Sequence, residues 1–258
     1  MDLKSVRMEI AKLFDLIGDE FVPDAVSMEQ FIATFFEKTE IRDKVILDAG
    51  CGTGIATVCF GKKQAKQSLG IDISYDCLRK GMELRNGHNL TNVNYQLGDI
   101  TNLPFCDNSF DLVSSVGVFP YINGRNKVTD EFRRILKRQG RLLIMSLRKQ
   151  KIDILYEWFR KILSNLPSRY HLLFARVMAF VIQPMSKIFL GRNILHGEKP
   201  ISQTILESFF VPQKLFKDSP EELKNLLEKK GFRIEVLNPP TLSFCSPKTV
   251  FVLKGKLL

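Results

Sequence analysis

The central part of the chain alternates between short apolar runs and segments whose apolar residues recur at helical spacing. Each apolar run ends at polar or glycine-rich positions, as expected for buried parallel strands. Between the runs, apolar residues recur every three to four positions, which indicates amphipathic helices. Alternation with short loops predicts a parallel sheet with right-handed crossovers. The pattern predicts strands near 44–49, 67–73, 92–97, 109–116 and 141–147, and helices near 55–64, 75–86 and 125–138, the last stopped by Gly140.

Both ends of the chain add elements to this core. Two helices are predicted in the N-terminal part, near 4–18 and near 27–38. Ser219 begins a further helix, because S-P-E-E combines an N-cap, a first-turn proline and a capping box. That helix stops at Gly231, and the last two strands are predicted at 232–238 and 249–257.

The regular alternation breaks for about 70 residues after the fifth predicted strand. Residues 152–166 have the apolar spacing of an amphipathic helix, and HLLFARVMAFVI at 171–182 is apolar nearly all round. We therefore expect a helical insertion over a substrate mouth rather than an independent domain.

Composition is that of an ordinary globular protein, with 45% hydrophobic and 26% charged residues. The N-terminus MDLKSVRMEI has no apolar run of signal-peptide type, and no stretch of about 20 apolar residues occurs. We therefore expect a cytoplasmic protein without a membrane span. The cysteines are scattered, without C-x-x-C or metal-ligand spacing, which predicts reduced thiols and no metal site. They are Cys51, Cys59, Cys77, Cys106 and Cys245.

The net charge of +10 is unevenly distributed along the chain. Residues 1–140 carry 18 Lys/Arg and 19 Asp/Glu, whereas residues 141–258 carry 20 and 9. The basic second part favours an anionic substrate, a phospholipid surface or RNA as a partner. A solvated surface with scattered lysines is the alternative explanation.

The decapeptide VILDAGCGTG joins the first predicted strand to the helix that follows it. Asp48 ends the strand, and Gly50, Gly52 and Gly54 follow at alternate positions. Glycines allow a backbone to approach a ligand closely, and the following helix N-terminus favours an anionic group. A dinucleotide fingerprint would need a third glycine where this chain has Ile55. The spacing therefore indicates a nucleotide site of another kind.

Two more carboxylates follow the next two predicted strands. Asp72 ends QSLGID, 22 residues after Gly50, where an acidic side chain can bind a ribose diol. Asp99 follows the third strand, in the segment GDITNLPFCDNSFDLV. Because parallel strands present their carboxyl ends at one edge of a sheet, we expect these carboxylates to lie near the glycine loop.

With these motifs the chain resembles the class I S-adenosylmethionine-dependent methyltransferases. It is similar to the branch with D-x-G-C-G-T-G and D-x-x-x-L-P-F-x-D-x-S-F-D, which includes ubiquinone- and menaquinone-biosynthesis methyltransferases. The resemblance covers about residues 10–148 and 219–254. It implies an α/β fold with a doubly wound, Rossmann-like, seven-stranded sheet, mostly parallel with one antiparallel strand. The domains that it implies are 1–148 for the N-terminal helices and the cofactor-binding core, 149–218 for a helical insertion or lid, and 219–258 for the C-terminal helix and terminal β-hairpin.

The resemblance also implies S-adenosylmethionine as the cofactor and a role for each motif. The glycine loop would lie beside the methionine part, with Asp48 at its edge or acting as a structural turn carboxylate. Asp72 would accept from both ribose hydroxyls and Asp99 from the adenine amino group, with an isoleucine after each. The implied cofactor-binding residues are Asp48, Gly50, Cys51, Gly52, Gly54, Asp72, Ile73, Asp99, Ile100 and Val116.

A catalytic base is not assigned by these motifs. The family often has a histidine after the fourth strand. This chain has VGVFPYIN there, in which Tyr121 is the polar side chain available to the site. His88 lies in a loop rich in Gly and Asn and is expected to face solvent. The catalytic candidates are therefore Tyr121, alternatively a structural tyrosine, and His171 and His196 in the insertion, since histidine titrates near neutrality.

Three functions remain open at this stage. A methyltransferase acting on a small hydrophobic or lipid-like acceptor fits the apolar insertion. An RNA or protein methyltransferase of the same fold would use the basic second part. A non-catalytic scaffold that binds S-adenosylmethionine would not need all of the intact motif residues. The stretch 171–182, too short to span a bilayer, either lies at an anionic membrane surface or forms a buried lid helix.

Overall fold

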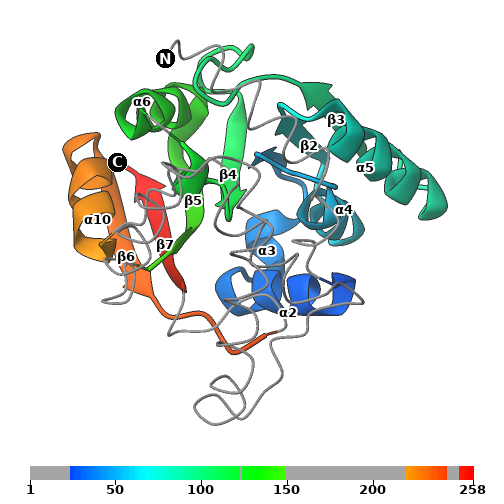
Figure 1. The fold of residues 1–258 in the computed structure, drawn as a ribbon, viewed down its shortest axis with the longest axis horizontal. Coiled ribbons are helices and arrows are strands. Elements are labelled where there is room, and N and C mark those ends of the chain that lie inside the picture. The colour runs from blue at the N-terminus through cyan, green and yellow to red at the C-terminus, as the bar shows by residue number, and fades with distance from the viewer. Residues whose placement is uncertain (1–23, 123, 149–218, 243–249) are drawn as a thin grey trace, which may run out of the picture. The chain divides into compact units, whose positions relative to one another are not determined.

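Seven apolar segments pair into a single mixed sheet in the computed structural model (Figure 1). The strand order is β3-β2-β1-β4-β5-β7-β6, and β7 runs antiparallel to both of its neighbours. The doubly wound sheet with one antiparallel strand is therefore confirmed. The strands are β1 Val45–Ala49, β2 Gln67–Asp72, β3 Val93–Leu97, β4 Phe110–Val116, β5 Leu136–Leu147, β6 Phe232–Leu237 and β7 Val250–Leu257.

The described residues all belong to one compact unit of the chain. None of their helices combines the length with the apolar character that crossing a bilayer demands. The helix predicted at 4–18 and the insertion at 149–218, with its apolar stretch and two histidines, lie outside the described residues. The structure describes residues 24–122, 124–148, 219–242 and 250–258.

Helices cover both faces of the sheet because strand residues alternate between two apolar cores. Leu47 faces the core that α6 and α10 complete, whereas Ile46 faces the core that α2, α3 and α4 complete. Helix α5 packs along β2 and β3 (Figure 1). The helices are α2 Ala25–Phe35, α3 Lys38–Ile41, α4 Ile55–Lys62, α5 Tyr75–Gly87, the 3₁₀ turn η2 Phe119–Tyr121, α6 Arg125–Ile135 and α10 Pro220–Lys229.

The helix predicted at 125–138 ends earlier, and Gly140 does not stop it. Helix α6 ends at Ile135, and β5 begins at the next residue, Leu136, which pairs with Phe110 of β4. The ladder then slips at a bulge, where Gln139 has a φ of 62°. The helical prediction was wrong here because Leu136 pairs with the sheet and is fully buried. The helical spacing of apolar residues in the sequence gives no sign of this pairing.

The helix predicted at 27–38 is two helices, α2 and the one-turn α3. Phe35 and Phe36 are both buried in the same core, at 5% and 4% exposure. Neighbouring residues of a helix point in directions about 100° apart, so the chain leaves the helical path to bury both rings. Phe36 is accordingly extended, with φ −132° and ψ 130°, and its ring meets Phe60 edge-on.

The strand order brings the predicted carboxylates to one edge of the sheet. β1 is hydrogen-bonded to β2 on one side and to β4 on the other, which makes the gap between β1 and β4 the switch point of the topology. Ligands of doubly wound sheets bind outside the carboxyl ends of the strands at this point. Asp48, Asp72 and Val116 lie near or at the carboxyl ends of their strands, and Asp99 follows β3.

Ser219 provides a test of how α10 is held. Its side chain accepts from the Glu222 amide at 3.3 Å, and the Ser219 amide donates to the Glu222 carboxylate at 3.4 Å. Ser219→Ala should lower the free energy of unfolding by about 0.5–2 kcal/mol in urea titrations. Ser219→Asp keeps an N-cap acceptor and should stay near the unchanged protein. Equal losses in both variants would contradict a capping role.

Candidate functional site

The loop between β1 and α4 is built from three glycines in left-handed conformations. Gly50, Gly52 and Gly54 have φ angles of 77°, 50° and 78°. A Cβ at Gly50 would lie 2.5 Å from the Val118 side chain, and one at Gly54 would lie 2.3 Å from the Tyr95 hydroxyl. A Cβ at Gly52 would have no described atom within 4 Å. Side chains thus pack closely against Gly50 and Gly54. The space beside Gly52 is open, so a ligand can reach the backbone there.

Backbone hydrogen bonds hold this glycine loop against β2. The amides of Gly50 and Cys51 both donate to the Ile71 carbonyl, at 2.8 and 3.0 Å. The Gly54 amide donates to the Cys51 carbonyl at 2.9 Å and closes the turn. Cys51 itself is half-buried. The position of the loop therefore depends on the end of the neighbouring strand as well as on its own glycines.

Asp72 is held in one orientation by two backbone amides. Gly52 donates to its Oδ2 at 2.8 Å and Ser74 donates to its Oδ1 at 2.9 Å. Both bonds are charge-assisted, which makes them stronger than ordinary amide bonds. A carboxylate fixed at this end of β2 suits a vicinal diol, whose two hydroxyls both donate.

Asp48 lies beneath the loop and is almost completely buried, at 2% exposure. Thr57 of α4 donates to its Oδ2 at 2.6 Å. Burial raises the pKa of the Asp48 carboxyl to about 7, the Thr57 hydrogen bond opposes this rise, and the charge of Asp72 adds to it. The carboxyl is therefore poised to change its charge near neutral pH, and Thr57 is a partner that the sequence analysis missed.

Helix α4 presents its N-terminus to the loop without a side-chain cap. Gly54 occupies the N-cap position, so among the described residues no hydroxyl or carboxylate caps the amides of the first turn, which begins at Ile55. Such amides and the helix dipole favour a negatively charged group. The site thus combines an electropositive helix end with the carboxylates of Asp72 and Asp99.

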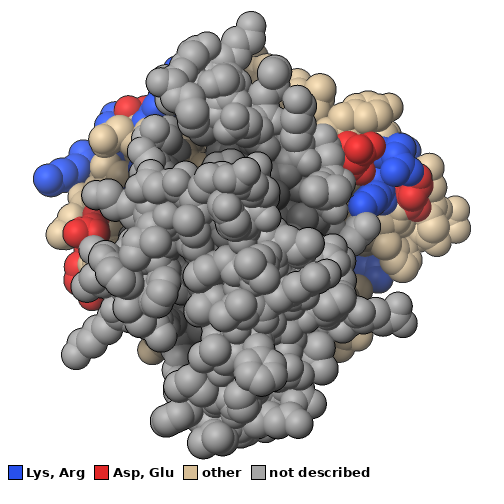
Figure 2. All heavy atoms as spheres, in the orientation of Figure 1, with Lys and Arg blue, Asp and Glu red and all other residues tan. Residues whose placement is uncertain are grey.

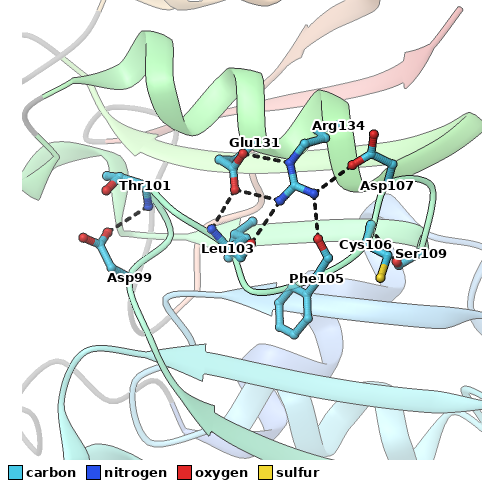
Figure 3. A network of polar contacts seen from close by, with 9 residues as sticks. All are labelled: Asp99, Thr101, Leu103, Phe105, Cys106, Asp107, Ser109, Glu131 and Arg134. Atoms are coloured by element: carbon cyan, nitrogen blue, oxygen red, sulfur yellow. Dashed lines mark hydrogen bonds and ion pairs between the residues drawn. The ribbon is translucent and has the colours of Figure 1, made fainter.

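The segment after β3 carries Asp99 and is tied down by α6 (Figure 3). The Thr101 amide donates to Asp99 Oδ1 at 2.8 Å. The amide of Leu103, four residues after Asp99, donates to Glu131 Oε2 of α6 at 2.6 Å. Glu131 is in turn bound by Arg134 through Nε and Nη2, both at 2.9 Å. We call this arrangement the Glu131–Arg134 clamp.

All five donors of the Arg134 guanidinium are used in the clamp. Besides Glu131, they reach the Leu103 carbonyl at 3.0 Å, the Phe105 carbonyl at 2.6 Å and Asp107 at 2.9 Å. The L-P-F motif is thus held by its backbone from a helix about 30 residues away, and only the arginine fork has the geometry to do this.

The remaining predicted site residues lie in the same region with different exposure. Ile100 is 7% exposed and packs in the core, whereas Ile73 and Val116 are half-buried. Tyr121 ends η2, and burial raises the pKa of its phenol above the ordinary value. His88 is exposed, as expected.

The structure adds residues to the site that the sequence patterns did not indicate. Val118 and Tyr95 pack against the glycine loop, Thr57 binds Asp48, and the clamp positions the Asp99 segment. Tyr95 and Gly54 are 41 positions apart, so local periodicity contains no signal for their contact.

The clamp should contribute measurably to stability. Arg134→Met removes charge-assisted bonds and leaves Glu131 uncompensated, so the free energy of unfolding should fall by about 1–3 kcal/mol. Arg134 holds the pKa of Glu131 below its usual value, chiefly through their hydrogen bonds. Stability from Glu131 is therefore present above about pH 4.3 and lost as pH falls through the lowered pKa.

The matched control is Arg133→Met, which removes an exposed neighbouring arginine of the same helix. Urea unfolding from about pH 3 to about pH 7 should give the unchanged protein and Arg133→Met the same acid slope. Arg134→Met should have a shallower one. Identical slopes in all three would contradict the clamp.

Asp48 should make stability fall as pH rises. Its folded pKa of about 7 exceeds the unfolded value near 4, so the stability due to the neutral carboxyl is fully present below about pH 4 and lost as pH rises through about 7. Asp48→Asn should remove this slope in urea titrations from about pH 4 to about pH 8. Asp43→Asn, which changes an exposed carboxylate, should keep it. A slope unaltered by Asp48→Asn would contradict the assignment.

Comparison with known proteins identifies a domain in the first part of the chain. A methyltransferase domain model matches residues 47–144. The demethylmenaquinone methyltransferase of Thermobifida fusca is 29% identical over 163 residues, which are 60% of this chain and 69% of the relative. That of Thermotoga maritima is 35% identical over 110 residues, which are 42% of this chain and 45% of the relative.

The fold comparison agrees with the sequence comparison. The crystal structure of a SAM-dependent methyltransferase from Aquifex aeolicus superposes with a TM-score of 0.56 at 18% identity and covers 100% of both chains. At this identity the match supports the fold alone.

The chemistry of the described residues fits S-adenosylmethionine. The open backbone at Gly52 leaves room for the ligand, and the first-turn amides of α4 suit its carboxylate. The Asp72 carboxylate suits its ribose diol. From these features and the matching domain, residues 47–144 form a methyltransferase domain of the class I S-adenosylmethionine-dependent type.

Proposed function

We propose that the protein transfers a methyl group from S-adenosylmethionine to a small, hydrophobic or lipid-like acceptor, and that residues 149–218 choose the acceptor. The observation that carries the acceptor class is the similarity to two demethylmenaquinone methyltransferases, whose names specify an apolar quinone. The apolar composition of residues 149–218 supports the same class.

The cofactor site that we propose follows the described geometry. Asp72 binds the ribose hydroxyls, and Asp99 accepts from the adenine amino group. Ile73 and Ile100 lie beside the adenine. The glycine loop with Cys51, the α4 N-terminus and Val116 lie at the methionine end, and Asp48 lies under the loop. The bound cofactor supplies a methyl group already activated by its sulfonium.

In this proposal the protein contributes mainly orientation and the exclusion of water. Holding two reactants in line can lower a barrier by roughly 7–11 kcal/mol, so a dedicated catalytic side chain is not required for every acceptor. Where the acceptor must lose a proton, a base helps by about 10²–10⁴-fold. The raised pKa of Tyr121 keeps its phenol protonated at neutral pH, which favours a donor role over a base role. His171 and His196 remain the candidate bases.

An RNA acceptor is less well supported by the described surface. In the parts of the molecule that Figure 2 shows in colour, basic and acidic side chains lie among one another. On α5, for example, Arg79 pairs with Asp76 at 3.8 Å and with Glu83 at 2.7 Å. Phosphate backbones favour surfaces with clustered, unpaired cations. The charges of α5 thus give no specific support to the RNA alternative.

Contact with an anionic membrane surface is part of the same proposal. The stretch 171–182 is flanked by Arg169 and Lys187 and contains Arg176, a composition typical of interfacial segments. A lipid-like acceptor would then be reached from the membrane surface. The competing role for this stretch is a buried lid over the acceptor.

The test is methyl transfer from radiolabelled S-adenosylmethionine into three separate fractions. These are membrane lipid extract supplemented with a demethylated quinol, total RNA, and protein extract. We expect label in the lipid fraction and at least about tenfold less with Asp72→Asn, because charge-assisted hydrogen bonds contribute about 1.5–3 kcal/mol. Label confined to RNA or protein would contradict the acceptor class, and no label in any fraction would contradict the activity.

A further inference from the structure

Tyr95 of β3 fills a space that three glycines on three different elements leave open. These are Gly54 at the start of α4, Gly70 of β2 and Gly81 of α5. A Cβ atom added at each of them would lie 2.3, 2.8 and 2.9 Å, respectively, from the Tyr95 side chain. Real Cβ atoms essentially never lie this close to a neighbouring atom, so each of the three positions needs glycine for the ring to fit where it is.

The hydroxyl of Tyr95 reaches the point where the glycine loop becomes helix α4. It donates to the Gly54 carbonyl at 3.2 Å, and the same carbonyl accepts from the Val58 amide at 2.9 Å. Three hydrogen bonds therefore hold Gly54. Its amide donates to the Cys51 carbonyl, and its carbonyl accepts from the Val58 amide and from the Tyr95 hydroxyl. The ring supplies the packing and the hydroxyl fixes the carbonyl direction.

We propose that Tyr95 is a positioning residue for the methionine end of the cofactor. It acts through Gly54, whose orientation aims the first-turn amides of α4 at the carboxylate of the ligand. This inference rests on the proposed cofactor site. Burial raises the pKa of Tyr95 well above that of an exposed tyrosine, so the hydroxyl stays protonated and remains a donor across the physiological range.

The position of Tyr95 predicts a selective effect on one part of the ligand. The ribose and adenine are assigned to Asp72 and Asp99, which other hydrogen bonds hold in place. Loss of the Tyr95 hydroxyl leaves those bonds intact and removes its contacts with Gly54 and with the Thr57 side chain, both at the start of α4. Binding of the amino-acid end of the ligand should therefore weaken, while binding of the adenosine part should not.

The experiment compares two ligands on three forms of the full chain. The ligands are S-adenosylhomocysteine and 5′-methylthioadenosine, which lacks the amino-acid end. The variants are Tyr95→Phe, which keeps the ring, and the control Thr129→Val. Thr129 is fully buried on α6 and donates its hydroxyl to the Asn126 carbonyl at 2.9 Å, so the control removes a comparable bond elsewhere. Affinity is measured by calorimetry, and unfolding temperature is measured in parallel.

We expect Tyr95→Phe to weaken S-adenosylhomocysteine about fivefold, which corresponds to one hydrogen bond of about 1 kcal/mol, and 5′-methylthioadenosine by less than about twofold. Thr129→Val should change neither affinity. Unchanged affinity for S-adenosylhomocysteine in Tyr95→Phe would overturn the positioning role. Equal weakening of both ligands with a lower unfolding temperature would also overturn it, because that is the result of a merely structural bond. If the unchanged protein binds neither ligand, the cofactor site itself is wrong.

Discussion

The site depends on the close approach of one backbone segment, residues 50–54, to the end of β2, to Tyr95 of β3 and to Val118, which follows β4. Two successive amides of this loop share the Ile71 carbonyl of β2, while Val118 and Tyr95 pack where side chains of Gly50 and Gly54 would otherwise be. This packing leaves no room for a Cβ atom at Gly50 or Gly54. At Gly52, by contrast, no described atom would meet a Cβ atom, so the backbone is accessible to a ligand. The left-handed φ angles of the loop also require glycine, because residues with an L side chain rarely adopt them.

Two carboxylates near this loop have opposite physical environments. Asp48 is buried with one hydroxyl partner, so desolvation raises its pKa to about 7. Asp72 is half-buried and accepts from two amides, which fix its direction. Because the two side chains also repel each other electrostatically, a ligand with a positive charge near Asp48 would favour its ionised form.

Much of the fold could be predicted from the sequence, since most strands and helices follow the spacing of apolar residues. The errors lie where a side chain is buried by a distant element. Leu136 leaves the helical pattern because it pairs with Phe110. The two neighbouring phenylalanines at the end of α2, Phe35 and Phe36, end that helix because both enter one core. In both places the competing helical prediction was reasonable locally, and long-range packing decided otherwise.

The sequence by itself determined the order of elements, the glycine loop and the placement of Asp48, Asp72 and Asp99 near strand ends. These are local properties, set by periodicity, by backbone preferences and by the polar residue that follows each apolar run. Only the tertiary structure decided how deeply Asp48 is buried, and that Thr57, Tyr95 and the Glu131–Arg134 clamp support the site. The physical reason is that burial and hydrogen bonding depend on distances between residues up to 41 positions apart, and those distances exist only once the sheet has formed.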